Sequence, residues 1–148
     1  MSEPQYWFDA THTHAAAAVF LLTRDCRLVL QLRDDKPDIH YPGMITPFGG
    51  GAEPGESAVQ CALRELEEET GLVARAEDLE LLGAVSRVDF RGHPTATVFF
   101  LLHGVDPDGL VITEGAAIVI PLAVIAKEPR LTDNCRRFSA MIADRERA

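Results

Sequence analysis

Apolar residues along the chain gather in short runs that are separated by turn-forming residues. Runs of this length, bounded by Gly, Pro or Asp, are typical of β-strands. The pattern predicts strands over residues 15–23, 26–33, 80–90, 95–104 and 115–122. We expect turns near Asp25 and at Arg91-Gly92, and the segment 34–44, rich in Pro, Asp and Gly, predicts a loop.

Two other segments have the spacing of amphipathic helices. In Ser57–Thr70, apolar residues recur every three or four positions. The predicted buried stripe consists of Val59, Ala62, Leu63, Leu66 and Thr70. Ser57 is a suitable N-cap and Gly71 a suitable C-cap. Leu131–Arg147 predicts a C-terminal helix that Thr132 or Asp133 would cap. Strands with interspersed helices indicate an α/β sandwich.

The composition is that of a globular protein. The chain has 148 residues, of which 47% are hydrophobic and 25% charged, so we predict one domain over residues 1–148. The net charge of −9 argues against binding of nucleic-acid polymers, because such binding requires a basic surface. A small anionic substrate remains compatible with this charge if cations accompany it.

The N-terminal segment and the cysteines bear on cellular location. Residues 1–14 lack the basic region of a signal peptide, and the longest apolar run, Ala15–Leu22, is too short to cross a bilayer. Cys26, Cys61 and Cys135 show no CxxC spacing, so we expect reduced, buried thiols. These features predict a cytoplasmic protein that does not contact a membrane.

The predicted helix 57–70 carries an unusual number of glutamates beside a run of three glycines. Glu65, Glu68 and Glu69 are spaced i, i+3 and i+4, so they share one helical face, whereas Glu67 points away. Like charges on one face repel each other, and a hard divalent cation such as Mg²⁺ would reverse that repulsion. The glycines would allow a loop carbonyl to approach as a further ligand. An acidic run alone is also typical of a solvated helix face.

The spacing of the whole stretch distinguishes between these two interpretations. Five residues separate Gly50 from Glu56, and seven separate Glu56 from Arg64-Glu65-Leu66. One residue then precedes Glu68-Glu69, and one more precedes Gly71-Leu72. This spacing matches the Nudix box at every defined position. Over Gly50–Leu72 the chain therefore resembles the Nudix hydrolase family. The resemblance implies a Nudix-type α/β/α sandwich with a mixed β-sheet.

The resemblance also implies a function and a metal. Nudix hydrolases cleave a nucleoside diphosphate linked to another group, using Mg²⁺ or Mn²⁺. Carried over to this chain, Glu65, Glu68 and Glu69 would hold the metal, helped by the carbonyl of Gly49. A metal that neutralises the diphosphate and aligns a water agrees with phosphoryl-transfer chemistry, which depends mostly on positioning and charge.

Two further roles follow from the same resemblance. Arg64 and Glu56 would form a buried pair that orients the glycine loop and the helix. Glu68 or Glu69 is the first candidate for the base that takes the proton of the water. The family sometimes places its base outside the box, so Glu114 is a second candidate, although an ordinary loop acid is an equal interpretation.

Residues outside the box are candidates for contacts to the substrate. Arg33 ends an apolar strand and could reach a phosphate or form a surface ion pair. Tyr41 and Phe48 flank the glycines and could stack on a base, although core packing is also typical of Phe48. Ile45 stands where many Nudix proteins that read YPGxW have a Trp. His12 and His14 alternate as a metal pair would, but without a third ligand they favour a polar strand edge.

Three functional hypotheses remain open. The first is a Nudix pyrophosphohydrolase, and the second is a non-catalytic Nudix-like sensor that binds a nucleotide, which the intact set of acids disfavours. The third is an isomerase or another activity on this scaffold, which usually needs additional Cys or Glu residues. Nucleoside triphosphates, nucleotide sugars, ADP-ribose and dinucleoside polyphosphates are all candidate substrates. A homodimer is common for the fold.

Overall fold

The computed structural model describes residues 14–88 and 91–147 as one mixed sheet between two helices. The strands are β1 (His14–Leu22), β2 (Arg27–Leu32), β3 (Ile45–Thr46), β4 (Phe48–Gly51), β5 (Leu79–Val88), β6 (Pro94–Leu102) and β7 (Ala116–Pro121). The helices are α1 (Ala58–Thr70) and α2 (Asp133–Arg147), with short 3₁₀ segments η1 (Ala76–Asp78), η2 (Pro107–Gly109) and η3 (Leu122–Lys127). All five predicted strands and both predicted helices are present, within two residues at the ends that the structure describes.

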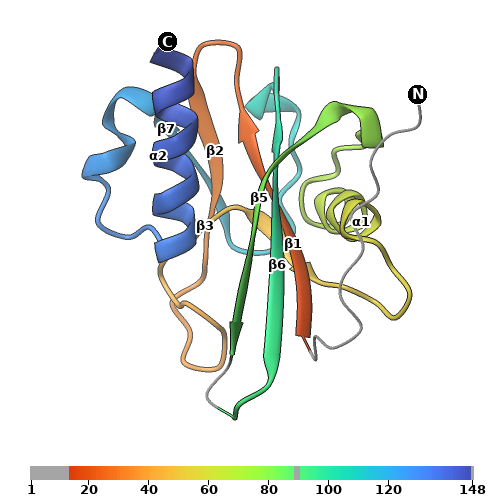
Figure 1. The fold of residues 1–148 in the computed structure, drawn as a ribbon. Coiled ribbons are helices and arrows are strands. Elements are labelled where there is room, and N and C mark those ends of the chain that lie inside the picture. The colour runs from red at the N-terminus through yellow and green to blue at the C-terminus, as the bar shows by residue number, and fades with distance from the viewer. Residues whose placement is uncertain (1–13, 89–90, 148) are drawn as a thin grey trace.

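The sheet is built around β1. The strand order is β3-β2-β1-β6-β5, while β4 pairs with β1 and β7 pairs with β2. Among the strand pairs of the described residues, β1–β6 is the only parallel one. Figure 1 shows α1 and α2 on opposite sides of this sheet, which confirms the predicted α/β/α sandwich with a mixed sheet.

The two faces of β1 explain why both sides of the sheet are covered. Its residues alternate between two apolar cores, as side chains on a strand must. The core on the α2 side includes Phe20, Leu30, Phe99, Phe138 and Ile142. The core on the α1 side includes Val19, Leu21, Phe48, Leu66 and Phe100. Because β1 is apolar on both faces, it fits only the interior of a layered fold.

Local signals fix the ends of α1. Ser57 accepts a hydrogen bond from the backbone N–H of Gln60 at 3.1 Å, and the Gln60 side chain accepts one from the Ser57 N–H at 2.9 Å. This reciprocal capping box starts the helix. Gly71 has φ of +74° and ends it, with its N–H donating to the carbonyl of Glu67. Both predicted caps are confirmed.

Three expectations need correction. The glycines Gly49, Gly50 and Gly51 are not a turn but part of β4, which pairs with the small residues of β1. Cys26 is exposed in the turn between β1 and β2, because the turn holds it at φ of +60° outside both cores, whereas Cys61 and Cys135 are buried free thiols as predicted. The C-terminal helix begins at Asp133 rather than Leu131, and Thr132 precedes it as a cap, its hydroxyl accepting from the N–H of Cys135 at 3.4 Å.

Some expectations concern residues outside the described ranges. His12 and the side chain of His14, predicted to form a polar edge, are among them, and so is the rest of the N-terminal segment. Across 14–88 and 91–147, no helix has the length and apolarity needed to cross a membrane.

Candidate functional site

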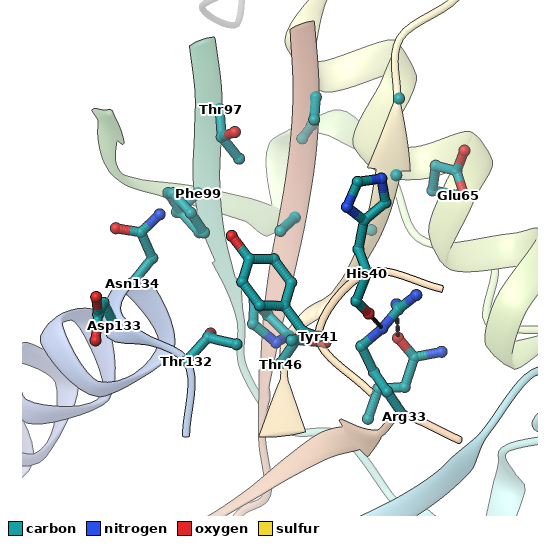
Figure 2. A pocket seen from close by; sticks show the side chains of 18 of the residues that line it. Arg33, His40, Tyr41, Thr46, Glu65, Thr97, Phe99, Thr132, Asp133 and Asn134 are labelled. Atoms are coloured by element: carbon teal, nitrogen blue, oxygen red, sulfur yellow. Dashed lines mark hydrogen bonds between the residues drawn. The ribbon is translucent and has the colours of Figure 1, made fainter. Parts of the chain in front are cut away.

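A cavity of about 510 Å³ opens between the glycine strand β4, the start of α2 and the loop after β2. Figure 2 shows Glu65 on one side of this cavity and the first residues of α2 on the other, with Tyr41 between them in this view. Its polar lining comprises Gln31, Arg33, His40, Tyr41, Thr46, Glu65, Arg87, Thr97, Glu114, Thr132, Asp133 and Asn134. Residues far apart in the sequence therefore meet in one cavity.

The glycines of β4 let the strand approach both β1 and α1. A Cβ at Gly49 would lie 2.2 Å from the carbonyl oxygen of Ala17, so the close pairing with β1 requires glycine there. A Cβ at Gly50 would lie 2.6 Å from the carboxyl carbon of Glu65. The carboxylate of Glu65 therefore occupies the space that a side chain on β4 would fill, directly against the strand backbone.

Arg64 ties α1 to the segment that leads into it. Its Nε and one terminal nitrogen donate to the two carboxylate oxygens of Glu56 at 2.8 and 2.9 Å, and the same terminal nitrogen reaches the carbonyl of Gly51 at 2.9 Å. The side chains are 23% and 11% exposed, so the pair is mostly but not fully buried. The hydrogen bonds from Arg64 hold the pKa of Glu56 below its usual range.

The second terminal nitrogen of Arg64 faces the acidic side of the helix. It lies 3.0 Å from Glu65 and 3.3 Å from Glu68. With Glu53 at 3.7 Å, one guanidinium thus partly neutralises four carboxylates, and its own pKa is raised, chiefly by its hydrogen bonds to Glu56. The structure brings Arg64 and Glu56 together with the acidic face, as the resemblance implied.

The glutamates of α1 lie at different depths. Glu67 is exposed and points away from the site. The side chain of Glu68 is 58% exposed, and within the described residues it pairs with Arg64. Glu69 is only 6% exposed and faces the sheet. The shared helical face therefore runs from solvent at Glu68 to the interior at Glu69.

Glu69 is the most perturbed acid of the site. Its Oε2 accepts a hydrogen bond from Nε2 of Gln31 at 3.1 Å, while its buried Oε1 accepts none from any residue that the structure describes. Burial raises the pKa of Glu69 to about 8, and the nearby carboxylates of Glu65 and Glu114 add to that rise. A buried carboxylate without compensating charge is a position where a cation would be stabilising.

Glu114 reaches this site from the segment before β7. The N–H of Thr113 donates to the carbonyl of Glu69 at 3.1 Å, and its hydroxyl donates to the carbonyl of Glu68 at 3.0 Å. These bonds hold the segment against the end of α1. The side chain of Glu114 is exposed and lines the cavity. The structure thus places Glu114 beside the acids of the helix, although it lies far from them in the sequence.

The acidic residues fit a hard divalent cation, although no ready-made metal site is present. Among residues 14–88 and 91–147, no three His, Cys, Asp or Glu side chains are grouped to hold a metal ion. The fit rests on the chemistry of the donors. Glu69 has a buried oxygen without a partner, Gly50 leaves the space that Glu65 fills, and carboxylates are the ligands that Mg²⁺ and Mn²⁺ prefer.

The residues expected to contact substrate separate into two groups. Arg33 lines the cavity, and its Nε donates to the carbonyl of His40 at 2.6 Å. Tyr41 also lines the cavity, is 59% exposed and has φ of +52°. Phe48 is a correction: its side chain is fully buried in the α1-side core and cannot stack on a base. Strand alternation turns it away from the cavity. Ile45 is likewise fully buried.

The wall formed by the start of α2 was not predicted. The cavity is lined here by Thr132, Asp133 and Asn134. The side-chain Oδ1 of Asn134 accepts a hydrogen bond from Arg87 of β5 at 3.2 Å. Among the cavity residues outside the motif, Gln31 gave a usable sequence signal, because it is the one polar residue among the four buried positions of β2.

Comparison with known proteins places this arrangement in a family. The family model described as NUDIX domain matches residues 12–133. The chain belongs to the Nudix family. It is 34% identical over 93 residues to an ADP-ribose pyrophosphatase from Methanocaldococcus jannaschii, an alignment that covers 61% of this chain and 52% of that protein. The chain thus spans about half the length of this curated Nudix relative.

Solved structures support the Nudix fold. The MutT protein from Methanosarcina mazei Go1 superposes with a TM-score of 0.74 at 19% identity, covering 95% of this chain and 99% of that one. The Escherichia coli dihydroneopterin triphosphate pyrophosphohydrolase superposes with a TM-score of 0.67 at 22% identity, covering 88% and 95%. At such low identity these likenesses establish the Nudix fold alone.

Proposed function

We propose that this protein is a pyrophosphohydrolase that depends on Mg²⁺ or Mn²⁺ and cleaves a nucleoside diphosphate linked to another group. The observation that carries the proposal is the buried, uncompensated carboxylate of Glu69 beside Glu65, which lines a cavity that also contains Arg33. Family membership supports a hydrolase, and the name of the 34% identical relative supports a nucleoside diphosphate derivative as substrate.

In this proposal the metal is held by Glu65, Glu68 and Glu69 with the carbonyl of Gly49. When bound, the cation would neutralise the diphosphate, lower the pKa of a water and stabilise the leaving oxygen. The chain supplies the remaining groups. Arg33 provides a positive charge in the same cavity, where its guanidinium can pair with a phosphate oxygen.

The proton of the attacking water requires a carboxylate that solvent can reach. Glu68 is exposed and therefore the better placed of the two box candidates, whereas Glu69 is buried and holds its own proton near neutral pH when no cation is bound. Glu114 also lines the cavity and remains the alternative base. Arg64 acts here as an organising residue, because it bonds to Glu56, Glu65 and Glu68.

The experiment is a panel assay with Mg²⁺ and with Mn²⁺. ADP-ribose, nucleotide sugars, nucleoside triphosphates and dinucleoside polyphosphates would be offered, and the released nucleotide or phosphate measured. We expect cleavage of at least one compound that disappears in EDTA and in Glu69→Gln, while the matched Glu67→Gln variant retains it. Tight binding of a nucleotide without cleavage of any compound would instead favour the sensor hypothesis.

A further inference from the structure

We propose that Gln31 is a positioning residue that sets the orientation of the Glu69 carboxylate and couples it to Arg33. The inference rests on the proposed function, because the value of this orientation depends on Glu69 holding a cation. Gln31 lies on β2, outside the Nudix box, and is only 1% exposed.

The amide of Gln31 uses its donors and its acceptor on three separate groups. Nε2 donates to Oε2 of Glu69 at 3.1 Å and to the backbone carbonyl of Glu114 at 3.0 Å. Oε1 accepts from a terminal nitrogen of Arg33 at 3.5 Å. Both Gln31 and Arg33 line the cavity, so this bond lies at its wall. One buried side chain therefore contacts α1, the segment before β7 and the residue that follows β2.

These partners allow only one orientation of the amide. Turning it by half a rotation would place its oxygen against the Glu69 carboxylate and the Glu114 carbonyl, which are both acceptors, and its NH₂ against a guanidinium, which is a donor. Three favourable contacts would become three unfavourable ones. In a buried position such a reversal is strongly disfavoured.

The fixed amide decides which oxygen of Glu69 is free. Oε2 is held by Gln31, whereas Oε1 accepts no hydrogen bond from the residues that the structure describes. A neutral donor suits this task better than Lys or Arg would, because it orients the carboxylate without neutralising the charge that a cation needs. Groups that hold a metal ligand from behind typically change metal affinity by 10–100-fold when they are removed.

The coupling to Arg33 adds a second consequence. The same amide that orients the candidate metal ligand also restrains the guanidinium proposed to meet a phosphate. Loss of Gln31 should therefore weaken both cation binding and substrate binding. Loss of Arg33 alone should weaken substrate binding and leave cation binding without nucleotide unchanged.

The test uses Gln31→Met, which keeps the length of the side chain and removes every hydrogen bond. Mn²⁺ binding to the full chain is measured by titration calorimetry without any nucleotide. We expect the Mn²⁺ dissociation constant to rise about tenfold or more. In turnover assays on the substrate that the panel identifies, KM should rise in addition to a fall in kcat.

Gln60→Met is the matched control. Gln60 belongs to the capping box of α1, so its loss destabilises the same helix without touching Glu69. We expect its Mn²⁺ affinity to match that of the unsubstituted protein. An affinity of Gln31→Met within twofold of the unsubstituted value would overturn the positioning role while leaving the proposed function intact. Absence of Mn²⁺ binding by the unsubstituted protein would overturn both.

A second measurement needs no variant. The chain has three glutamines, Gln5, Gln31 and Gln60, so the side-chain amide signals are few in an NMR spectrum of the unsubstituted protein. The amide protons of Gln31 should exchange with water far more slowly than those of the exposed Gln60, and their signals should move when Mg²⁺ is added. Exchange as fast as that of Gln60 would contradict the geometry on which the inference rests.

Discussion

Carboxylates that share one helical face can have different roles, because the burial of each one sets the free-energy cost of its charge. Glu68 is largely exposed, whereas Glu69 is almost fully buried one residue later. Water screens the first, so its charge costs little. The second is shielded from water and has two other acids nearby, so its charge is costly until a cation compensates it.

Glutamine substitutions on α1 should separate these roles. Glu→Gln keeps the size of a side chain and removes its charge. We expect Glu68→Gln and Glu69→Gln each to lower kcat by about 10²–10⁴-fold, the range typical of a general base or a comparable electrostatic role. The kcat of Glu65→Gln should also fall, and its affinity for the metal should be weaker. Rates at saturating Mg²⁺ check this, and a Glu67→Gln variant as inactive as Glu68→Gln would contradict the assignment.

The raised pKa of Glu69 predicts how the metal-free protein responds to pH. In the folded chain the pKa of Glu69 is about 8, whereas the ordinary value, expected in the unfolded chain, is 4.5. Between these values the folded state binds more protons, so stability falls as pH rises and levels off above pH 8. Denaturation in EDTA from pH 5 to pH 9 measures this slope.

Two comparisons isolate the contribution of Glu69 in that experiment. Glu69→Gln has no titrating group at this position, so its stability should depend less steeply on pH. The unsubstituted protein with saturating Mg²⁺ should also lose most of the slope, because the cation favours the charged carboxylate. Identical slopes in all three conditions would show that Glu69 titrates normally.

At the scale of elements, Arg64 joins α1 to β4 and to the turn before the helix. We expect Arg64→Ala to lower the free energy of unfolding by about 2 kcal/mol, between the values for exposed and fully buried pairs, because the Glu56 carboxylate loses its partner in a mostly buried position. Activity should fall as well. Chemical denaturation of the metal-free variant checks the stability effect, and an inactive variant of unchanged stability would point to direct contact with substrate.

Alanine substitutions at the three glycines of β4 test the contacts of this strand with β1 and with α1. Gly49→Ala would place its Cβ against the backbone of β1, so it should lower stability. Gly50→Ala would displace the flexible carboxylate of Glu65 and should lower metal affinity with little loss of stability. Gly51→Ala meets only an ordinary contact at 3.9 Å and serves as the control. Melting curves and Mn²⁺ titrations of the three variants distinguish these outcomes.

How well an element could be predicted depended on how local its signals are. The ends of α1 follow from Ser57, Gln60 and Gly71, which act within one turn of the helix. The strand β4 could not be predicted in the same way, because a run of glycines is typical of a turn. It becomes a strand only because Ala16, Ala17 and Ala18 of β1 are small enough to pair with it closely.

At the scale of the whole molecule, an acidic face that lacks its cation should limit stability. Adding millimolar Mg²⁺ should raise the melting temperature, since a ligand at 100 times its Kd stabilises by about 2.7 kcal/mol. For a chain of this size that is roughly 5–10 °C. Scanning calorimetry with Mg²⁺ and with EDTA makes the comparison. Superimposable curves would count strongly against the metal site.

The cavity as a whole shows the limit of what the sequence could predict. The acids of α1 and the glycines follow from one contiguous motif, and Glu114 and Arg33 were plausible additions. Thr132, Asp133 and Asn134 reach the same cavity only because α2 packs on the opposite side of the sheet from α1 and begins at its edge. For Phe48 the sequence left both base stacking and core packing open, because proximity to the motif does not reveal which face of a strand a residue occupies, and the structure shows core packing.

The parallel pairing of β1 with β6 has a consequence for how the chain reaches this structure. The register from His14↔Thr95 to Leu21↔Leu102 joins residues about 80 positions apart. During synthesis β1 and β2 can form their hairpin early, but the other edge of β1 stays open until β6 has left the ribosome. Pairings of such long range slow folding, and an apolar central strand left open meanwhile is prone to aggregation. The strand that anchors the finished sheet is thus exposed to aggregation while the chain is being made.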